Sequence, residues 1–258
     1  MVNLGRKYDS RVIIFRITWS GTSERRARRN RPLGVEVTLY QNDPRTLVTP
    51  ANWETYLVTQ ESISDGRSTP EIVSAAIDGG IDAVQLREKD ATARARYELG
   101  RRLRELTDAA DVPLIVNDRI DLAMAIDADG VHLGQTDLPV SVARTLLGDD
   151  AIVGCSAWRV DDARAAEREG ADYLGTGAVY GTSSKDVDED KDGIGPEGVA
   201  AVTDAVSIPV VGIGGITPAN AAAVVDAGAT GVAVISSITA AEDPATATQH
   251  LGEVVADA

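Results

Sequence analysis

Two cationic side chains and an amide occupy alternate positions in segment 83–89, which reads Ala-Val-Gln-Leu-Arg-Glu-Lys. Successive side chains of a strand point to opposite faces, so Gln85, Arg87 and Lys89 share one face. Two cations beside an amide predict an anion site. The alternative is that the cations pair with carboxylates at the rim. We favour the anion site, because an inward-facing pair of cations is costly without a partner.

Two aspartates follow the next two candidate strands. Asp118 comes after Asn117, and Asp137 closes the run His-Leu-Gly-Gln-Thr-Asp that begins at His132. One or two carboxylates with substrate phosphate oxygens form the usual protein site for Mg²⁺, so this pair predicts a magnesium site. Each aspartate could instead cap the helix that follows it, and for either one alone the cap is the more common role.

Three glycine- or hydroxyl-rich turns predict a second phosphate site. Residues 177–185 combine glycines with Thr182, Ser183, Ser184 and Lys185, a composition that can cradle a phosphate, or form a flexible surface loop. Residues 212–218 contain three glycines, and residues 235–237 read Ile-Ser-Ser. Glycine lets a ligand approach the backbone closely, so these turns suit binding through N–H groups.

Short β-branched runs alternate with alanine-rich helical runs from about Trp53 onward, which predicts eight βα units. Repeated βα units form a parallel sheet, and eight can close into a (β/α)8 TIM barrel. An open doubly wound sheet is less consistent, because no glycine fingerprint follows the first strand. The expected strands are 56–60, 83–87, 114–117, 130–133, 152–156, 173–177, 210–213 and 232–235. The expected helices lie near 70–79, 92–110, 119–127, 139–147, 160–169, 196–205, 217–227 and 243–256.

The charge of the 258-residue chain is uneven. Residues 1–50 hold ten basic and four acidic residues, a net charge of +6, whereas residues 51–258 hold fifteen basic and thirty-six acidic residues, a net charge of −21. We interpret 1–50 as a disordered basic extension or translated sequence upstream of the true start, with a nucleic-acid-binding arm as the alternative. Residues 51–258 would form the barrel.

The acidic block excludes nucleic acid and anionic membranes as partners. Lysine is scarce, with four residues in the chain, and an acidic, lysine-poor surface is typical of a halophile-like protein whose self-repulsion concentrated salt screens. No apolar run approaches the roughly 18 residues of a membrane helix, and charges interrupt the first 20 residues. We therefore expect a cytoplasmic protein, and a homo-oligomer remains open.

Neither a nucleophile nor a general base is evident. Cys155, the single cysteine, excludes an intrachain disulfide and reads as a buried strand residue. Ser156 ends a strand and can reach the barrel mouth, but no neighbouring base would activate it, so we assign it a hydrogen-bonding role. His132 lies on a strand, where packing or hydrogen bonding is more common than catalysis.

The ordered set of motifs resembles the thiamine-phosphate synthase family over about residues 53–240. The matching pieces are segment 85–89, Asn117-Asp118, residues 132–135 with Asp137, Ser156-Ala157, residues 182–185, residues 212–216 and Ile235-Ser236. The resemblance implies an Mg²⁺-dependent transferase of thiamine biosynthesis on a TIM barrel. It joins two small phosphorylated substrates, a pyrimidine-methyl diphosphate and a thiazole phosphate (carboxylated or not), and forms thiamine phosphate and pyrophosphate by a dissociative mechanism.

The resemblance also implies roles for individual residues. The pyrimidine diphosphate would contact Gln85, Leu86, Arg87, Glu88, Lys89, Asn117, Ser156 and Lys185, of which Arg87, Lys89, Ser156 and Lys185 would be catalytic. Asp118 and Asp137 would hold Mg²⁺. The thiazole phosphate would contact Thr182, Ser183, Ser184, Gly215, Ile235 and Ser236. The alternatives are a thiazole tautomerase-like barrel, which would not need the full set of cations and carboxylates, and a non-catalytic thiamine-phosphate-binding protein, which loss of the aspartate pair would favour.

Overall fold

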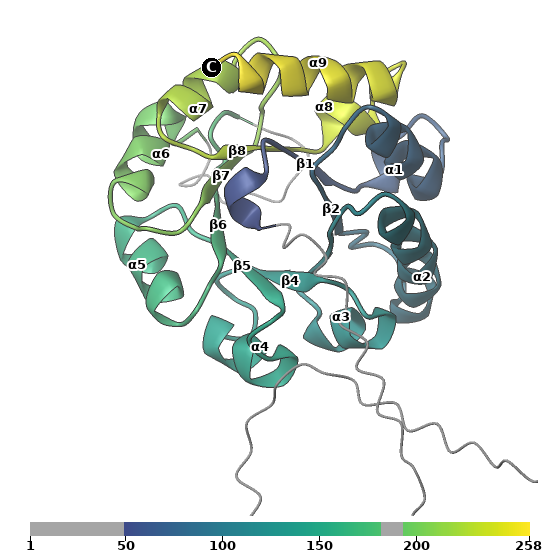
Figure 1. The fold of residues 1–258 in the computed structure, drawn as a ribbon, viewed down its shortest axis with the longest axis horizontal. Coiled ribbons are helices and arrows are strands. Elements are labelled where there is room, and N and C mark those ends of the chain that lie inside the picture. Colours follow the sequence, from purple (N-terminus) through teal and green to yellow (C-terminus); the bar gives the residue numbers. More distant parts are fainter. Residues whose placement is uncertain (1–48, 182–192) are drawn as a thin grey trace, which may run out of the picture. The chain divides into compact units, whose positions relative to one another are not determined.

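Each short β-branched segment of the chain forms one strand of a closed parallel sheet (Figure 1). A computed structural model describes residues 49–181 and 193–258. The strands follow chain order around the barrel, each paired in parallel with the next, and β8 closes against β1. They are β1 (Thr55–Val58), β2 (Ala83–Leu86), β3 (Leu114–Asn117), β4 (Gly130–Leu133), β5 (Ile152–Ser156), β6 (Tyr173–Thr176), β7 (Val210–Ile213) and β8 (Gly231–Val234). The predicted TIM barrel is confirmed.

Helices surround the sheet, as Figure 1 shows. They are α1 (Thr69–Asp78), α2 (Ala93–Ala109), α3 (Ile120–Ile126), α4 (Val140–Leu147), α5 (Val160–Arg168), α6 (Gly195–Thr203), α7 (Ala221–Asp226), α8 (Ser236–Thr239) and α9 (Pro244–Ala256). Two short 3-10 turns, η1 (Pro50–Asn52) and η2 (Glu61–Ile63), flank β1. Among these described helices, none is long and apolar enough to cross a membrane.

Near the C-terminus, one predicted helix begins later than expected and one short helix was not predicted. The helix expected from 217 begins at Ala221, because the Asn220 side chain accepts the Thr217 N–H at 2.8 Å and donates to the Gly215 carbonyl at 3.1 Å. These bonds hold 217–220 as a turn rather than as a first helical turn. The short α8 was not predicted, since four residues are too few to establish a helical period.

The strands separate two apolar layers. Alternate side chains such as Val84 and Leu86 pack outward under the helices in the larger cluster. The inward-facing positions form a smaller cluster inside the barrel, with Trp53, Tyr56 and Tyr173 in ring contact. This alternation places Gln85 on the inner face, as the period of two predicts.

Three aspartates, Asp82, Asp129 and Asp172, tie neighbouring strands together at the amino-terminal end of the barrel. Each immediately precedes an even-numbered strand, and its side chain accepts the N–H of a residue on the preceding strand: Thr55 at 2.8 Å, Leu114 at 2.8 Å and Val153 at 2.7 Å. The backbone N–H of each aspartate returns a bond to the carbonyl of that same residue. We call these two-way connections the aspartate latches.

The corresponding pair of β7 and β8 carries Thr230 at the equivalent position. Its N–H donates to the Val210 carbonyl at 2.8 Å, as in the latches, but threonine supplies no carboxylate. Arg104 and Arg144 add ion pairs to two of the latches, with Asp129 and Asp172 respectively. The polar residues at the amino-terminal end of the barrel thus stabilise the sheet. The polar residues proposed from the sequence to bind substrate lie at the opposite, carboxyl end.

Candidate active site

Lys89, Asp118 and Asp137 meet at the carboxyl ends of β2, β3 and β4. The Lys89 Nζ lies 3.6 Å from Asp118 Oδ2. Asp118 in turn lies close enough to Asp137 for its charge and a hydrogen bond to act on that carboxyl group. Because catalytic groups of this fold occupy the strand carboxyl ends, this cluster marks the mouth as the candidate site.

Asp118 adopts an unusual backbone conformation, a left-handed turn with φ of 63°. Its N–H donates to the His132 carbonyl at 2.8 Å, which continues the β3–β4 ladder by one residue. The helix-cap alternative does not apply to either aspartate. Arg119 is the N-cap residue of α3 and Pro139 that of α4, and neither helix has a side-chain cap bond.

Asp137 is held by its own loop, because its Oδ2 accepts the Gly134 N–H at 2.7 Å. Burial raises the pKa of the Asp137 carboxyl group. The Gly134 hydrogen bond and the Lys89 charge lower this pKa, whereas the charge and hydrogen bond of Asp118 raise it. Burial is the main cause of the net upward shift, and the Asp118 charge adds to it, so a bound cation would favour the ionised form of both carboxyl groups.

Arg87 and Gln85 are both nearly buried, with 8% and 4% of their surfaces exposed. The Arg87 backbone N–H donates to Thr59 Oγ1 at 3.1 Å, and its guanidinium group makes one long contact, 3.5 Å, to Gln60 Oε1. Among the described residues, no carboxylate lies within ion-pair distance of Arg87. Lys89 therefore pairs with a carboxylate at the rim, as the alternative interpretation predicted, whereas the buried charge of Arg87 is available to an anion.

Glu88 and Leu86 support this strand end from outside the mouth. The Glu88 carboxylate accepts the Glu61 N–H at 3.1 and 3.0 Å and the Thr69 hydroxyl at 2.9 Å. It thereby fixes the turn after β1 to the start of α1. Leu86 packs in the outer apolar layer. Both side chains therefore hold the strand end in place, and their predicted contact with the pyrimidine diphosphate stays a prediction.

Asn117 and Ser156 lie at the ends of β3 and β5. The Asn117 Nδ2 is buried and has no hydrogen-bond partner among the described residues. Ser156 Oγ lies 2.9 Å from His132 Nε2. An unpartnered buried amide and a serine hydroxyl at the strand ends are two polar groups that a ligand could use.

The predicted second phosphate site is described in part. Gly215 has φ of +65°, and a Cβ there would lie 2.7 Å from the Gly181 carbonyl oxygen, so only glycine fits. Ile235 and Ser236 stand where β8 passes into α8, and among the described residues the N–H groups of Ser236 and Ser237 have no backbone acceptor. Thr182, Ser183, Ser184 and Lys185 lie outside the described residues, so their placement stays a prediction.

Sequence reasoning missed Tyr56 and Tyr173, which line a small cavity inside the barrel together with Gln85 and His132. Tyr56 Oη lies 3.0 Å from Tyr173 Oη. The sequence signal was available: each tyrosine has an inward position on a strand whose other inward residues are small or aliphatic. An aromatic residue at such a position usually fills the core, so the hydroxyl group was overlooked.

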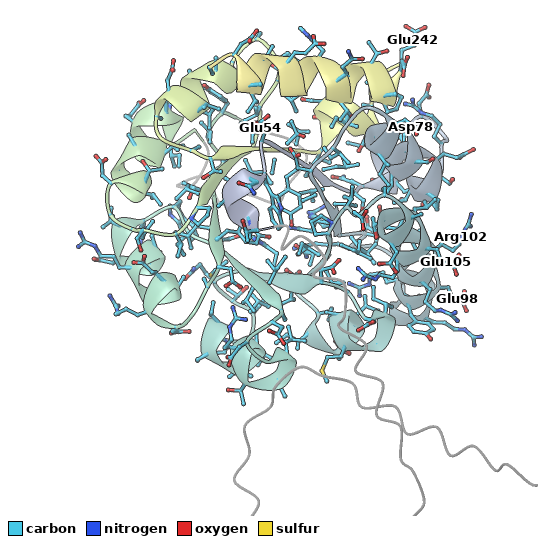
Figure 2. All side chains as sticks on the ribbon, in the orientation of Figure 1. Glu54, Asp78, Glu98, Arg102, Glu105 and Glu242 are labelled. Atoms are coloured by element: carbon cyan, nitrogen blue, oxygen red, sulfur yellow. The ribbon has the colours of Figure 1, made fainter. Side chains whose placement is uncertain are left out.

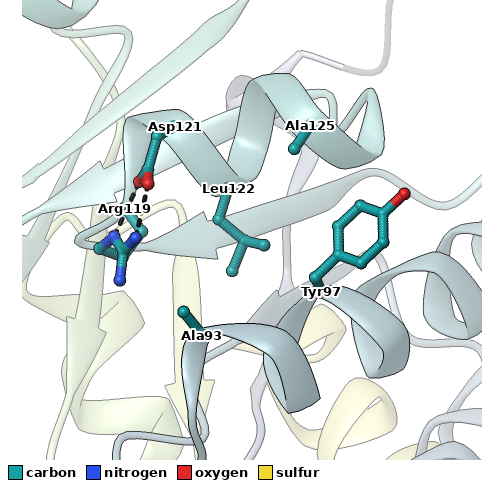
Figure 3. Close-up of a pocket in the computed structure, with 6 residues that line it drawn as sticks. All are labelled: Ala93, Tyr97, Arg119, Asp121, Leu122 and Ala125. Atoms are coloured by element: carbon teal, nitrogen blue, oxygen red, sulfur yellow. Dashed lines mark hydrogen bonds and ion pairs between the residues drawn. The ribbon is translucent and has the colours of Figure 1, made fainter.

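A second hollow lies on the outside of the barrel between α2 and α3, as Figure 3 shows. Tyr97 and Leu122 supply its apolar walls, and Arg119 pairs with Asp121 at its edge through bonds of 2.7 and 2.5 Å. None of the residues proposed from the sequence lines it. The mouth, where those residues gather, remains the candidate site.

The family model described as Thiamine monophosphate synthase matches residues 55–238. The chain belongs to this family. The chain is 63% identical to the thiamine-phosphate synthase of Haloarcula marismortui over 205 residues, which are 79% of this chain and 97% of that one. It is 52% identical to the thiamine-phosphate synthase of Moorella thermoacetica over 203 residues, 79% of this chain and 96% of the relative.

Solved structures agree with this family assignment. The thiamine phosphate pyrophosphorylase from Pyrococcus furiosus superimposes with a TM-score of 0.73 at 40% identity, over 81% of this chain and 98% of that one. A 3-hexulose-6-phosphate synthase superimposes with a TM-score of 0.59 at 17% identity, over 78% of this chain, and shows the shared barrel fold alone.

Proposed function

We propose that this chain condenses a pyrimidine-methyl diphosphate with a thiazole phosphate to give thiamine phosphate and pyrophosphate. Membership of the thiamine monophosphate synthase family supports this reaction. The observation that carries it at the level of residues is the meeting of Lys89, Asp118 and Asp137 at three adjacent strand ends, beside the buried Arg87. Such a mouth suits a diphosphate with a divalent cation.

The donor set at the mouth fits Mg²⁺. Asp118 and Asp137 offer carboxylate oxygens, and the pKa of Asp137, raised by burial and by the Asp118 charge, is one that a bound cation would lower. Two carboxylates completed by substrate phosphate oxygens and water are the usual Mg²⁺ arrangement. We therefore propose that these two residues hold Mg²⁺, which would neutralise charge on the diphosphate when bound.

The chemistry that remains for the protein is binding and charge stabilisation. The bond between the pyrimidine methylene carbon and the diphosphate oxygen breaks, and its electron pair leaves with the diphosphate. The thiazole nitrogen then forms the new bond to that carbon. Arg87 and Lys89 would stabilise the leaving charge, together with Lys185, and Asn117 and Ser156 would donate hydrogen bonds to it. No general base is required for this reaction.

The second substrate would be held separately by its phosphate group. The backbone N–H groups at Gly215 and Ser236, with the predicted ligands Thr182, Ser183, Ser184 and Ile235, would bind it on the β6–β8 side of the mouth. Fixing both partners in one cavity lowers the entropic cost of their meeting.

Purified full-length protein, mixed with both substrates and Mg²⁺, tests this function. Thiamine phosphate and pyrophosphate should form in equal amounts, and omission of Mg²⁺ should stop their formation. The assay is run in low and high potassium chloride, because the acidic body is expected to need salt. Absence of pyrophosphate under both conditions would overturn the proposed function.

A further inference from the structure

Five side chains form a continuous hydrogen-bonded chain across the barrel interior. Gln85 Nε2 donates to Tyr56 Oη at 2.8 Å, and Tyr56 Oη lies 3.0 Å from Tyr173 Oη. Tyr173 Oη lies 3.0 Å from His132 Nδ1, and His132 Nε2 lies 2.9 Å from Ser156 Oγ. The chain thus begins at a buried amide on β2 and ends at a hydroxyl group at the mouth end of β5.

The first bond of this chain determines the direction of the others. The Gln85 amide nitrogen can only donate, so the Tyr56 oxygen accepts, and the single Tyr56 hydrogen is free to bond Tyr173. Tyr173 then accepts from Tyr56 and gives its own hydrogen to His132 Nδ1. A neutral imidazole that accepts at Nδ1 carries its proton on Nε2.

The opposite direction leaves a buried hydrogen without an acceptor. If Tyr173 donated to Tyr56, the Tyr56 oxygen would accept twice, and its own hydrogen would have no acceptor among the described residues. Tyr56 is 2% exposed, so water cannot readily replace the missing acceptor. An unsatisfied buried hydroxyl group is unfavourable, so the direction from Gln85 to Ser156 is preferred.

Both tyrosines remain hydroxyl donors throughout the working pH range. Burial raises the pKa of Tyr56 and of Tyr173 well above that of an exposed tyrosine. Phenylalanine at either position would keep the aromatic ring, and with it the ring contacts between Tyr56, Tyr173 and Trp53. The hydroxyl groups can therefore be tested separately from the aromatic core.

We infer that His132 and Tyr173 are positioning residues that set the orientation of the Ser156 hydroxyl group. His132 Nε2–H donates to Ser156 Oγ, so the serine hydrogen is not used by the histidine and points to an acceptor in the mouth. Among the described residues, His132 is the one hydrogen-bond partner of Ser156 Oγ. This inference rests on the proposed function for its ligand: Ser156 donates to a diphosphate oxygen, and no proton is transferred.

The tautomer of His132 can be observed directly by ¹⁵N NMR on the full-length protein. The chain has two histidines, and His250 is exposed on α9, so it serves as an internal reference that H250Q assigns. We expect His132 to be protonated at Nε2 and unprotonated at Nδ1, and Y173F to give a mixture of tautomers while the His250 signals stay unchanged. Protonation at Nδ1 in the wild-type protein would overturn the inference. If Y173F does not fold, Y56F gives the same test, because it removes the hydrogen bond between Tyr56 and Tyr173.

Kinetics of a double-mutant cycle test whether Tyr173 acts through Ser156. We expect Y173F to lower kcat about tenfold, and S156A to lower it by about ten- to a hundredfold, with an unchanged KM for the thiazole phosphate. Y173F should have no further effect when Ser156 is already alanine. Independent, multiplying effects would overturn the inference. If the wild-type protein formed no thiamine phosphate, the proposed function would fail. The NMR result would still show which tautomer His132 adopts, and hence the direction of the hydrogen bonds.

Discussion

The Lys89 ammonium group lies 3.6 Å from Asp118 Oδ2, and the lysine side chain is half exposed. An exposed pair at this distance contributes little to stability, about 0–1 kcal/mol. The pair therefore matters for the charge that it places at the mouth. Lys89 offsets part of the negative charge of Asp118 while no cation is bound, and both groups lie where a metal-bound diphosphate is proposed to sit.

Replacement of Asp118 should separate activity from folding. We expect D118A to lower kcat at least about a hundredfold and to weaken the response to Mg²⁺, while the melting temperature changes by about 2 °C or less. Steady-state assays over a range of Mg²⁺ concentrations and thermal unfolding measure the two effects. D149N, in the exposed turn after α4, is the matched control and should behave as wild type. Full activity in D118A would remove this residue from the proposed site.

Asp137 should destabilise the metal-free fold at neutral pH. Its pKa is raised in the folded state, so the folded protein binds this proton more tightly than the unfolded chain does. The resulting cost is absent below the unfolded pKa, grows as the pH rises between the two pKa values, and is complete above the folded pKa. D137N should therefore raise the melting temperature without Mg²⁺ at pH 7, by about 1–3 °C, and the gain should vanish at acidic pH.

Added Mg²⁺ provides the control for that measurement. It should stabilise the wild-type protein more than D137N, because a ligand that binds only the folded state stabilises it. An equal response of both proteins to Mg²⁺ would contradict the assignment of Asp137 as a ligand.

Loss of one aspartate latch should destabilise the barrel without affecting its chemistry. Asp129 accepts the Leu114 N–H at 2.8 Å and pairs with Arg104, whose side chain is 11% exposed. Its removal leaves a part-buried N–H without its side-chain acceptor, and leaves Arg104 paired with Asp108 alone at 2.8 Å. We expect D129A to lower the free energy of unfolding by about 1–3 kcal/mol, measured in denaturant. The value of kcat at a temperature where the variant is folded should match that of wild type.

Cys155 should be unreactive in the folded protein. Burial raises the pKa of its thiol to about 11, and the charges of Glu169, Asp162 and Asp137 act in the same direction. At pH 8 about one thiol in a thousand is then the nucleophilic thiolate. Reaction with a disulfide reagent should be slow in buffer and fast in denaturant, where the thiol is exposed. Rapid labelling of the native protein would show that β5 opens readily.

Salt should stabilise the protein more than is usual for a barrel of this size. Residues 51–258 carry a net charge of −21, and Figure 2 shows acidic side chains such as Glu98, Glu105 and Glu242 on its outer surface. Counter-ions screen repulsion among exposed carboxylates. We expect the melting temperature to rise with potassium chloride concentration through the molar range. A flat or falling curve would refute the halophile-like interpretation.

The sequence predicted the strands closely, because each is a short β-branched run bounded by turn residues. Four strands have the predicted bounds, and the other four differ by one or two residues. The site was predictable to the extent that polar residues follow strands in a barrel, which brings Lys89, Asp118 and Asp137 together. The hydrogen bonds of the Tyr56 and Tyr173 hydroxyl groups could not be predicted, since they join strands that are distant in sequence. The short α8 and the late start of α7 depend on local hydrogen bonds in turns, which the hydrophobic periodicity of the sequence does not reveal.

The aspartate latches give the barrel an uneven seam. Three of the four junctions between an odd-numbered strand and the next strand are fastened by a carboxylate, whereas the junction of β7 and β8 has Thr230 there and depends on backbone bonds at that point. Among these four junctions, the one between β7 and β8 therefore has the fewest side-chain bonds at its base, directly below the glycine turn proposed to hold the thiazole phosphate. If the sheet opens at one of the four, local opening and binding of the second substrate would involve the same strand pair.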